Sequence, residues 1–410
     1  MPSIDPARLL GDLRRLAEFG RYKTGVHRPT YSKEDMEARR WLVERMTEAG
    51  LNASIDGIGT VLGRSASPGP CLLIGSHLET QPYAGWLDGA MGVIYGLEVA
   101  RAFRESPECR NLAIDVGAWA DEEGHYGSML GSRSFCGVLS EAEIDAAGNK
   151  MSGQKLRDAL AEAGLSGRKR ERLEAGRYLG YVEAHVEQGD LLDSSGLRLG
   201  IVTGIVGIYG YRFTALGQQN HAGTTRMATR KDAGVALMRL WHAIDQRFPA
   251  VAGPHSVWTT GRITLDPGAT SVIPGKAEMQ FQFRDIARER LAIMDEALLA
   301  LVAEANARGP CRIEAEVIAR TEPHAMDAAL QEALERAAQA RAPRMLVRMQ
   351  SGAGHDAQIF APHLPAGMLF VPSIAGISHH YAEDTREDDI VLGCQVLADA
   401  AASVLQARSA

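Results

Sequence analysis

Short apolar runs with little alternation recur in the first half of the chain and again near its C-terminus. They lie at residues 71–77, 111–123, 180–185 and 367–373. A strand covered on both faces shows such a run, because neither of its faces alternates with solvent. The runs therefore predict a mainly parallel sheet with helices on both of its faces.

Helical spacing of apolar residues is found beside these runs. Residues 89–103 place Val93, Leu97 and Ala100 at helical spacing, directly after the first run. Ser32, with Asp35 three residues later, is typical of a helix N-terminus and predicts a helix that ends near residue 50. Strands and helices that alternate in this way indicate an α/β domain.

The middle of the chain follows a different pattern. Within it, Met279, Phe281 and Phe283 alternate with polar residues, which predicts strands with one face in solvent. The predicted order is strand, helix, strand, strand, helix, strand, at residues 209–216, 229–247, 256–264, 276–284, 286–307 and 312–320. This order is the ferredoxin-like pattern.

The change of pattern predicts an insertion. The expected fold class is α/β, with a mixed, mainly parallel-sheet domain formed by residues 1–207 and 322–410. A smaller ferredoxin-like α+β domain is inserted at residues 208–321. A length of 410 residues agrees with two domains, because single hydrophobic cores rarely grow beyond about 250–300 residues.

Composition narrows the classes of function. The net charge of -7, with no basic stripe for phosphates, argues against a nucleic-acid partner. No segment approaches the roughly 20 uninterrupted apolar residues of a membrane span. Acidic residues close to the N-terminus argue against a secretion signal, so a cytoplasmic location is expected. The five cysteines lack CxxC spacing, which makes a disulfide framework or a thiolate zinc site unlikely.

Residues that can bind metal or move protons lie at or just after the apolar runs. They are His77, Asp88, Glu122, Glu123, His185 and His379. The carboxyl ends of parallel strands meet at one edge of a sheet, where ligands gather. Any one such residue is more often solvated or structural, but five potential ligands, each at a predicted strand end, favour a common site, with Glu122 as an extra acid beside Glu123. Imidazole and carboxylate donors suit zinc, manganese, cobalt or nickel, and a carboxylate can bridge two ions.

The adjacent acids Glu122 and Glu123 can divide two tasks between them. Neighbouring side chains point in different directions, so one can bind metal while the other remains free as a general base. The zinc-protease motif HExxH, which divides the same tasks within one helix, does not occur in the chain.

Several segments carry a resemblance to a known family. They are AHVEQG, TGIVGI, GQQNHAGTTRMATRKDAG, SVIPG, FRD and SGAGHDA. In these segments the chain resembles the hydantoinase/carbamoylase amidases, which include N-carbamoyl-L-amino-acid hydrolases, allantoate amidohydrolases and β-ureidopropionases. The resemblance runs nearly end to end. It places the chain with the dinuclear metallopeptidase-like aminoacylases and carboxypeptidases.

The resemblance implies a role for each ligand-type residue. Asp88 would bridge two divalent metal ions per subunit, with zinc expected first and manganese, cobalt or nickel as alternatives. His77 and His185 would complete the site of one metal. Glu123 and His379 would complete the site of the other. A hydroxide held between the metals would attack the substrate.

The resemblance also implies catalytic and substrate-binding residues. Glu122 would activate the attacking water and then protonate the leaving nitrogen. His221, in the inserted dimerisation and lid domain, would steady the oxyanion from the partner subunit of a homodimer. Arg284 would bind a substrate carboxylate, for which its planar fork is suited. The other residues implied to bind substrate are Gln188, Ser271 and Gly354.

Three interpretations remain open from the sequence. Arg284 ends a predicted strand and could pair with a neighbouring acid. His355 and Asp356 look like metal ligands but have no place in the implied ligand set, so they are interpreted as stabilising their own turn through backbone hydrogen bonds. His379 is favoured over His380, because in relatives the position after the ligand is usually asparagine.

The chain departs from the common family pattern at several positions. Glu79 stands where aspartate is usual and where the acid normally orients the first metal-bound imidazole. The segment that begins at His125 and Tyr126 is shorter than usual and lacks an arginine-phenylalanine pair. Arg226 replaces a proline, and Ser271 replaces an asparagine that helps to hold substrate. These changes spare the expected metal chemistry and leave the substrate open.

The expected function is a dinuclear metal-dependent amidohydrolase that cleaves a linear amide or ureido bond. The expected substrate is a small N-carbamoyl or N-acyl amino acid with a carboxylate. A dipeptidase or aminoacylase acting through the same site is the alternative. A non-catalytic binding protein that keeps the fold is a remote alternative. Such a protein would be expected to have lost some of the ligands, whereas the set in this chain is complete.

Overall fold

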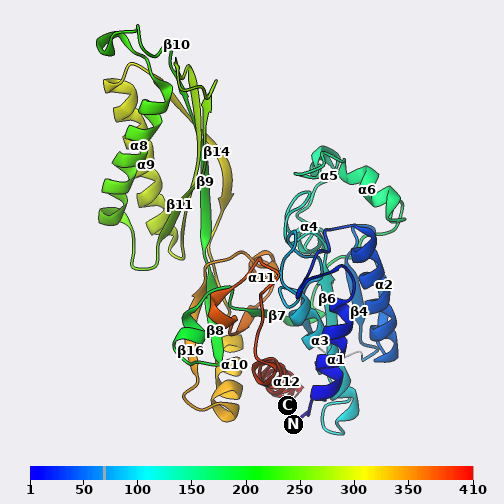
Figure 1. Cartoon of the computed structure of the whole chain (residues 1–410). Helices are drawn as coiled ribbons and strands as arrows, with labels where there is room; N and C mark the ends of the chain where they lie inside the picture. Colours follow the sequence, from blue (N-terminus) through cyan, green and yellow to red (C-terminus); the bar gives the residue numbers. More distant parts are fainter. Residues whose placement is uncertain (68–70, 410) are drawn as a thin grey trace. The chain divides into compact units, whose positions relative to one another are not determined.

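The computed structural model describes residues 1–67 and 71–409. The chain forms two compact units. Unit 1 comprises Met1–Thr203 and Ala325–Ala410, and unit 2 comprises Gly204–His324. Figure 1 shows both units coloured along the chain.

Unit 1 is built on a mixed nine-stranded sheet. The strand order is β15-β8-β17-β7-β5-β6-β4-β3, and β16 pairs with β8. The strands are β3 (Asn52–Ile55), β4 (Val61–Arg64), β5 (Cys71–His77), β6 (Ala113–Trp119), β7 (Tyr178–Val186), β8 (Leu199–Ile205), β15 (His324–Ala325), β16 (Leu346–Ser351) and β17 (Ala366–Val371). The central strands β17, β7, β5 and β6 pair in parallel, whereas β4, β3 and β8 pair antiparallel. The mixed α/β class is confirmed.

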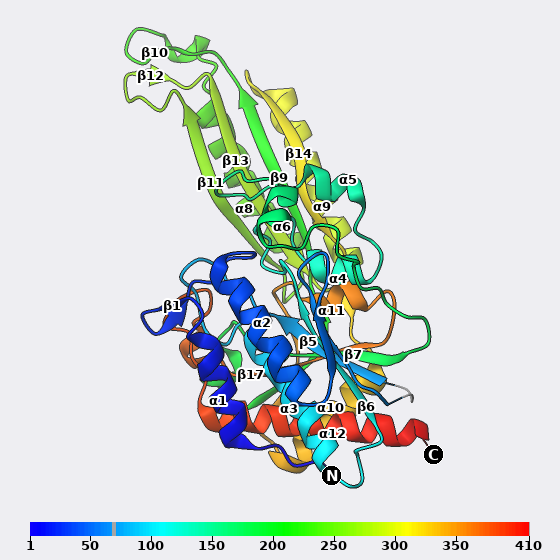
Figure 2. The same ribbon diagram turned by 90° about the vertical axis from the view of Figure 1, so that its right-hand side faces the viewer.

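The predicted buried runs form the centre of this sheet. All seven residues of β5 and all seven of β6 are buried. Helices α3 (Ala90–Glu105) and α12 (Glu387–Ser409) pack against the central strands, with α1 (Pro6–Ala17) and α10 (Ala328–Arg341) packed on them (Figure 2). The absence of alternation in the runs therefore reflects burial on both faces of the strands.

Helix α2 (Lys33–Glu48) begins where its N-cap signal predicted. The Ser32 hydroxyl accepts the backbone N–H of Asp35, which satisfies one of the free donors of the first turn. The helix packs on β3 and β4. The remaining described elements of unit 1 are β1 (Arg21–Tyr22), β2 (Gly25–Val26), α4 (Leu130–Phe135), α5 (Glu141–Ala146), α6 (Leu156–Glu162), α7 (Leu191–Ser194), α11 (Asp356–Phe360) and the 3-10 turn η2 (Ile374–Gly376).

Helix α12 is long and apolar enough, over Glu387–Ala407, to cross a membrane by length and composition alone. Acidic residues such as Asp399 interrupt its apolar residues, so the sequence shows no uninterrupted apolar run there. Most of this segment is buried inside the protein, where it contacts α10, α3 and the sheet. Such burial is typical of a core helix.

Unit 2 contains the predicted strand and helix order. Its four-stranded antiparallel sheet has the order β11-β13-β9-β14. The elements are β9 (Gly207–Leu216), α8 (Ala233–Val251), β11 (Val257–Asp266), β13 (Lys276–Asp285), α9 (Arg288–Arg308) and β14 (Arg312–Thr321). The alternating apolar residues, Phe281 and Phe283 among them, are buried with residues of α8 and α9 in one hydrophobic cluster.

The start of α8 differs from the prediction by four residues. The Asp232 carboxylate accepts the backbone N–H of Val235, so the helix begins at Ala233 rather than near residue 229. A short 3-10 turn, η1 (Met227–Thr229), precedes it. Strands β10 (Asn220–His221) and β12 (Val272–Ile273) form a separate two-stranded sheet in the same unit.

Candidate metal centre

The ends of the central strands bring four predicted ligands together in unit 1. His77 is the last residue of β5, and His185 lies one residue before the end of β7. Glu123 follows β6, and Asp88 lies in the turn just before α3. The fifth, His379, comes from the loop after β17, where it adopts a positive φ of 53°. Parallel pairing of these strands explains why residues so distant in sequence meet.

Asp88, His77 and His185 form one group of potential ligands. Asp88 Oδ1 lies 3.1 Å from His185 Nε2 and 3.4 Å from His77 Nε2. The potential ligand atoms lie within 4.8 Å of one another, and all three residues are buried.

Asp88, Glu123 and His379 form a second group. The other carboxylate oxygen of Asp88, Oδ2, lies 3.4 Å from His379 Nε2. The same His379 nitrogen lies 3.8 Å from Glu123 Oε2. Asp88 therefore offers one oxygen to each group. His380 is directed elsewhere, since its Nδ1 accepts the backbone N–H of Ala382.

Backbone carbonyls orient the two buried imidazoles. His77 Nδ1 lies 2.9 Å from the Glu79 carbonyl oxygen, and His185 Nδ1 lies 2.9 Å from the Val186 carbonyl oxygen. A carbonyl only accepts, so each Nδ1 carries a proton, and Nε2 is the atom that faces the group and would bind a cation once it has released its own proton. In relatives an acidic side chain is expected to orient the first imidazole. In this chain the backbone carbonyl of Glu79 does so.

Glu122 lies beside the first group without being part of it. Its Oε2 is 3.6 Å from His77 Nε2, and the residue is buried. Burial raises the pKa of Glu122 well above its usual value, and the charges of Glu123 and Asp88 act in the same direction. A carboxyl group with a raised pKa can exchange protons near neutral pH.

Gln188 lies closer to the potential ligands than its implied role in substrate binding suggested. Its Nε2 donates to Asp88 Oδ2 at 2.9 Å and lies 3.3 Å from His379 Nε2. Its backbone has a positive φ of 60°, and its N–H donates to the Ser373 hydroxyl. Gln188 Oε1 is buried without a hydrogen-bond partner among the described residues.

Two residues that hold this site were not predicted. The Gln81 side chain donates to Glu123 Oε2 at 2.8 Å. The Glu383 carboxylate accepts the backbone N–H of Asp88 at 3.0 Å and the Ser378 hydroxyl at 3.0 Å. Neither residue belongs to a pattern that indicates metal binding. The closeness of Glu383 to His379, within the segment HHYAED, was the only available signal.

The donor set fits divalent cations. Each group offers imidazole nitrogen and carboxylate oxygen, and no thiolate takes part. Burial alone would raise the pKa of Asp88, but His185, His379 and His77 hold it well below its usual value. Asp88 is therefore ionised and able to bind a cation through each oxygen.

The protonation of His379 makes cation binding dependent on pH. The hydrogen bond to Asp88 and the charge of Glu123 raise the pKa of His379 to about 9 in the metal-free protein. A cation must displace this proton, so its apparent affinity for the second group should fall roughly tenfold per pH unit below that pKa. Titration calorimetry in buffers of different ionisation enthalpy measures the released proton. A cation affinity that does not vary with pH would contradict the assignment of His379 as a ligand.

The turn that contains Gly354 packs behind the first group. His355 is buried, its ring centroid lies 4.6 Å from that of His185, and its Nε2 lies 2.9 Å from the Ser351 hydroxyl. Asp356 accepts the Ser132 hydroxyl. A Cβ on Gly354 would meet the end of the Met129 side chain at 3.2 Å. Neither His355 nor Asp356 belongs to either ligand group.

Three predicted residues lie in unit 2. His221 is exposed, and its Nδ1 accepts the backbone N–H groups of Gly223 and Thr224, at 3.0 and 3.2 Å. Its Nε2 therefore carries the proton. The Ser271 carbonyl accepts the backbone N–H of Ala222, next to His221, at 3.0 Å. Arg284 is half-buried on β13, where burial lowers its pKa and Gln282 Oε1 accepts from its Nη2 at 3.4 Å.

Other departures from the family pattern have local partners. His125 Nδ1 lies 2.9 Å from the Thr30 hydroxyl, and the Tyr126 hydroxyl donates to Gln154. Arg226 precedes η1 in unit 2, and nothing in its surroundings explains the replacement of proline.

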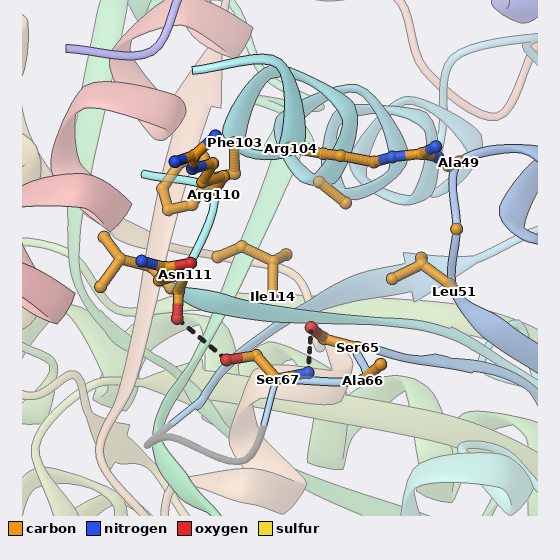
Figure 3. A pocket seen from close by; sticks show the side chains of 13 residues that line it. Ala49, Leu51, Ser65, Ala66, Ser67, Phe103, Arg104, Arg110, Asn111 and Ile114 are labelled. Carbon is orange, nitrogen blue, oxygen red and sulfur yellow. Dashed lines mark hydrogen bonds between the residues drawn. The ribbon is translucent and has the colours of Figure 1, made fainter. Parts of the chain in front are cut away.

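A surface cavity of about 670 Å³ lies away from these groups (Figure 3). It is lined in part by Phe103 and Arg104 of α3 and by Ser65 and Asn111. It adjoins the start of β6, whereas the predicted ligands lie at the ends of the strands. No predicted site residue is among its described lining residues.

Comparison with known proteins identifies the family of the chain. Residues 73–403 match the pattern of peptidase family M20/M25/M40. The chain belongs to this family. The resemblance to the hydantoinase/carbamoylase amidases is confirmed, and the protein is a hydrolase of the amidohydrolase type.

Its relatives match it along nearly their whole length. The N-carbamoyl-L-amino acid amidohydrolase of Geobacillus stearothermophilus is 33% identical over 96% of this chain and 97% of its own. The allantoate amidohydrolase of Bacillus subtilis is 33% identical over 94% of each chain. The crystal structure of a hydantoinase/carbamoylase family amidase from Burkholderia phymatum is 52% identical, with a TM-score of 0.91 over 99% of each chain.

Proposed function

We propose that the protein is a dinuclear metal-dependent amidohydrolase acting on N-carbamoyl or N-acyl amino acids. The observation that carries this proposal is Asp88, whose two oxygens face two different sets of ligands while Glu122 lies beside one of them. Relatives named N-carbamoyl-L-amino acid amidohydrolase and allantoate amidohydrolase support the substrate class.

In the proposed reaction, His77, Asp88 and His185 hold one cation, and Asp88, Glu123 and His379 hold the other. Two bound cations supply Lewis acidity, which polarises the scissile carbonyl and makes water more acidic. Glu122 removes a proton from the attacking water. As the carbon–nitrogen bond breaks, Glu122 returns that proton to the leaving nitrogen.

His221 stabilises the oxygen of the attacked carbonyl. Its Nδ1 accepts two backbone N–H groups, so its Nε2–H is free to donate. A positioned donor of this kind acts mainly in the transition state. Ser271, paired with the same turn, and Gly354 are proposed to contact the substrate.

The inserted unit is proposed to act as a lid and to form a homodimer, in which His221 serves the partner subunit. Helix α8 exposes apolar residues at helical spacing, namely Val235, Met238 and Trp241, with Met238 56% exposed. The edge strand β11 also exposes Val257 and Ile263. Apolar residues on an accessible helix and sheet edge favour association.

Arg284→Ala should raise the KM for carboxylate-bearing substrates by about 10- to 100-fold, the value of a charged hydrogen bond. The kcat should change little if Arg284 binds the carboxylate equally strongly in the substrate complex and in the transition state. Arg212→Ala is the matched control, because Arg212 lies on the same face of the same sheet and pairs with Glu316. Steady-state kinetics on both variants measures these KM values. An unchanged KM for Arg284→Ala would mean that another residue binds the substrate carboxylate.

A panel of N-carbamoyl amino acids, N-acyl amino acids, dipeptides and allantoate tests the function as a whole. Cleavage of an N-carbamoyl amino acid should release the amino acid with ammonia and carbon dioxide, identified by mass and by ammonia assay. Release of a carboxylic acid or of two amino acids instead would indicate an aminoacylase or a dipeptidase. Failure to cleave any member would contradict the proposal.

A further inference from the structure

The carboxylate of Glu79 joins the turn of Glu122 to a distant helix. Its Oε1 accepts the backbone N–H of Glu122 at 2.6 Å, and its Oε2 accepts from Arg39 Nη2 at 2.7 Å. Glu79 and Arg39 are both fully buried. Both oxygens of the side chain are thus engaged away from His77, whose Nδ1 lies 2.9 Å from the Glu79 backbone carbonyl oxygen.

Arg39 is itself held firmly. Its Nε donates to both oxygens of Asp35, one turn earlier on α2, at 2.9 and 3.0 Å. Its Nη1 donates to the Gly59 carbonyl at 2.8 Å. A guanidinium fixed by so many acceptors has one orientation, and it fixes the Glu79 carboxylate in turn.

The backbone on the other side of this contact is strained. Asp121 adopts a left-handed φ of 58°, which a residue with a Cβ adopts only when its surroundings compensate. Its carboxylate accepts the backbone N–H groups of His125 and Gly127, each at 2.7 Å. Those bonds fix the turn after the acidic pair. The Glu79 bond fixes the peptide unit that leads into Glu122.

We propose that Glu79 is a positioning residue for Glu122, and that Arg39 holds Glu79 in place. The inference rests on the proposed role of Glu122 in proton transfer. An aspartate at this position would be shorter by one carbon–carbon bond, about 1.5 Å. From the same backbone it could not both reach Arg39 and accept the Glu122 N–H.

The test is Glu79→Asp in the full-length, metal-loaded protein. The kcat should fall roughly 10- to 100-fold, the range typical of partners that orient groups at a metal site. The KM and the metal bound per subunit should stay within about twofold. In the metal-free protein, hydrogen exchange at the Glu122 amide, followed by mass spectrometry, should become faster. That readout requires no turnover.

Glu98→Asp is the matched control. Glu98 is also fully buried and accepts from Arg8 and from the Asp5 backbone N–H, each at 2.8 Å, but it contacts no residue of the site. The Glu98→Asp substitution should lower the melting temperature without changing kcat or hydrogen exchange at the Glu122 amide. Arg39→Lys should lower kcat less than Glu79→Asp, and the double variant should lose less than the product of the two effects, because both act through one contact.

The readouts separate this inference from the proposed function. If Glu79→Asp keeps its kcat and its Glu122 amide exchange, the positioning role is overturned. A fall in kcat that only matches a loss of bound metal would also overturn it and assign Glu79 to the support of His77. If the wild-type protein cleaves no member of the panel, the proposed function fails, while amide exchange still decides whether Glu79 holds Glu122.

Discussion

Glu122→Gln should lower kcat by about 10²- to 10⁴-fold, the usual contribution of general acid–base catalysis. Glutamine keeps the size of the side chain but cannot take a proton from water or return one to the leaving nitrogen. Glu122 belongs to neither ligand group, so bound metal should be retained. Metal analysis and steady-state kinetics on the same preparation measure both quantities.

Substitution of the neighbouring acid, Glu123, should have a different effect on bound metal. Glu123→Gln replaces a member of the second group, so it should lose metal together with activity. Glu174→Gln, at an exposed acid outside the site, should change neither. A Glu122→Gln variant with near-normal kcat would remove Glu122 as the base, and one that lost metal in proportion to its activity would make Glu122 a ligand.

The pattern of apolar residues predicted the framework well because burial leaves a direct trace in sequence. Strand β5 begins and ends at the predicted residues, and all seven of them are buried. Short elements such as β3, and the antiparallel pairing of β8 with β17, were not predicted. They depend on partners that only the folded sheet provides, because a four-residue strand carries too little pattern of its own.

The candidate ligands were predictable for a physical reason of the same kind. Residues such as His77 and His185 sit where buried parallel strands end, so topology brings them together. What orients them was not predictable. The carbonyls of Glu79 and Val186 set the imidazole tautomers, and any residue type supplies a carbonyl.

The role of Glu79 was also hidden from the sequence. Family resemblance suggested an acid that orients the first histidine. The longer side chain instead reaches Arg39 and the Glu122 amide. Both oxygens of this buried carboxylate therefore have partners that the sequence does not indicate.

Removal of divalent cations should abolish turnover, and Asp88→Asn should make the loss permanent. A chelator such as EDTA should inactivate the wild-type protein, and zinc, manganese or cobalt should restore it. Asparagine keeps the shape of Asp88 but replaces a charged oxygen with an amide. The variant should therefore bind little metal and remain inactive when metal is added. Chelator-resistant turnover in the wild type would refute a metal mechanism.

The two variants Asp88→Asn and His379→Ala test whether one carboxylate serves both groups. Asp88 offers Oδ1 to His77 and His185 and Oδ2 to the second group, so its substitution should reduce bound metal by close to two ions per subunit. His379→Ala affects only the second group, so one ion per subunit should remain. A loss of only one ion per subunit in Asp88→Asn would contradict the Asp88 bridge, because removal of a shared ligand must weaken the binding of both ions.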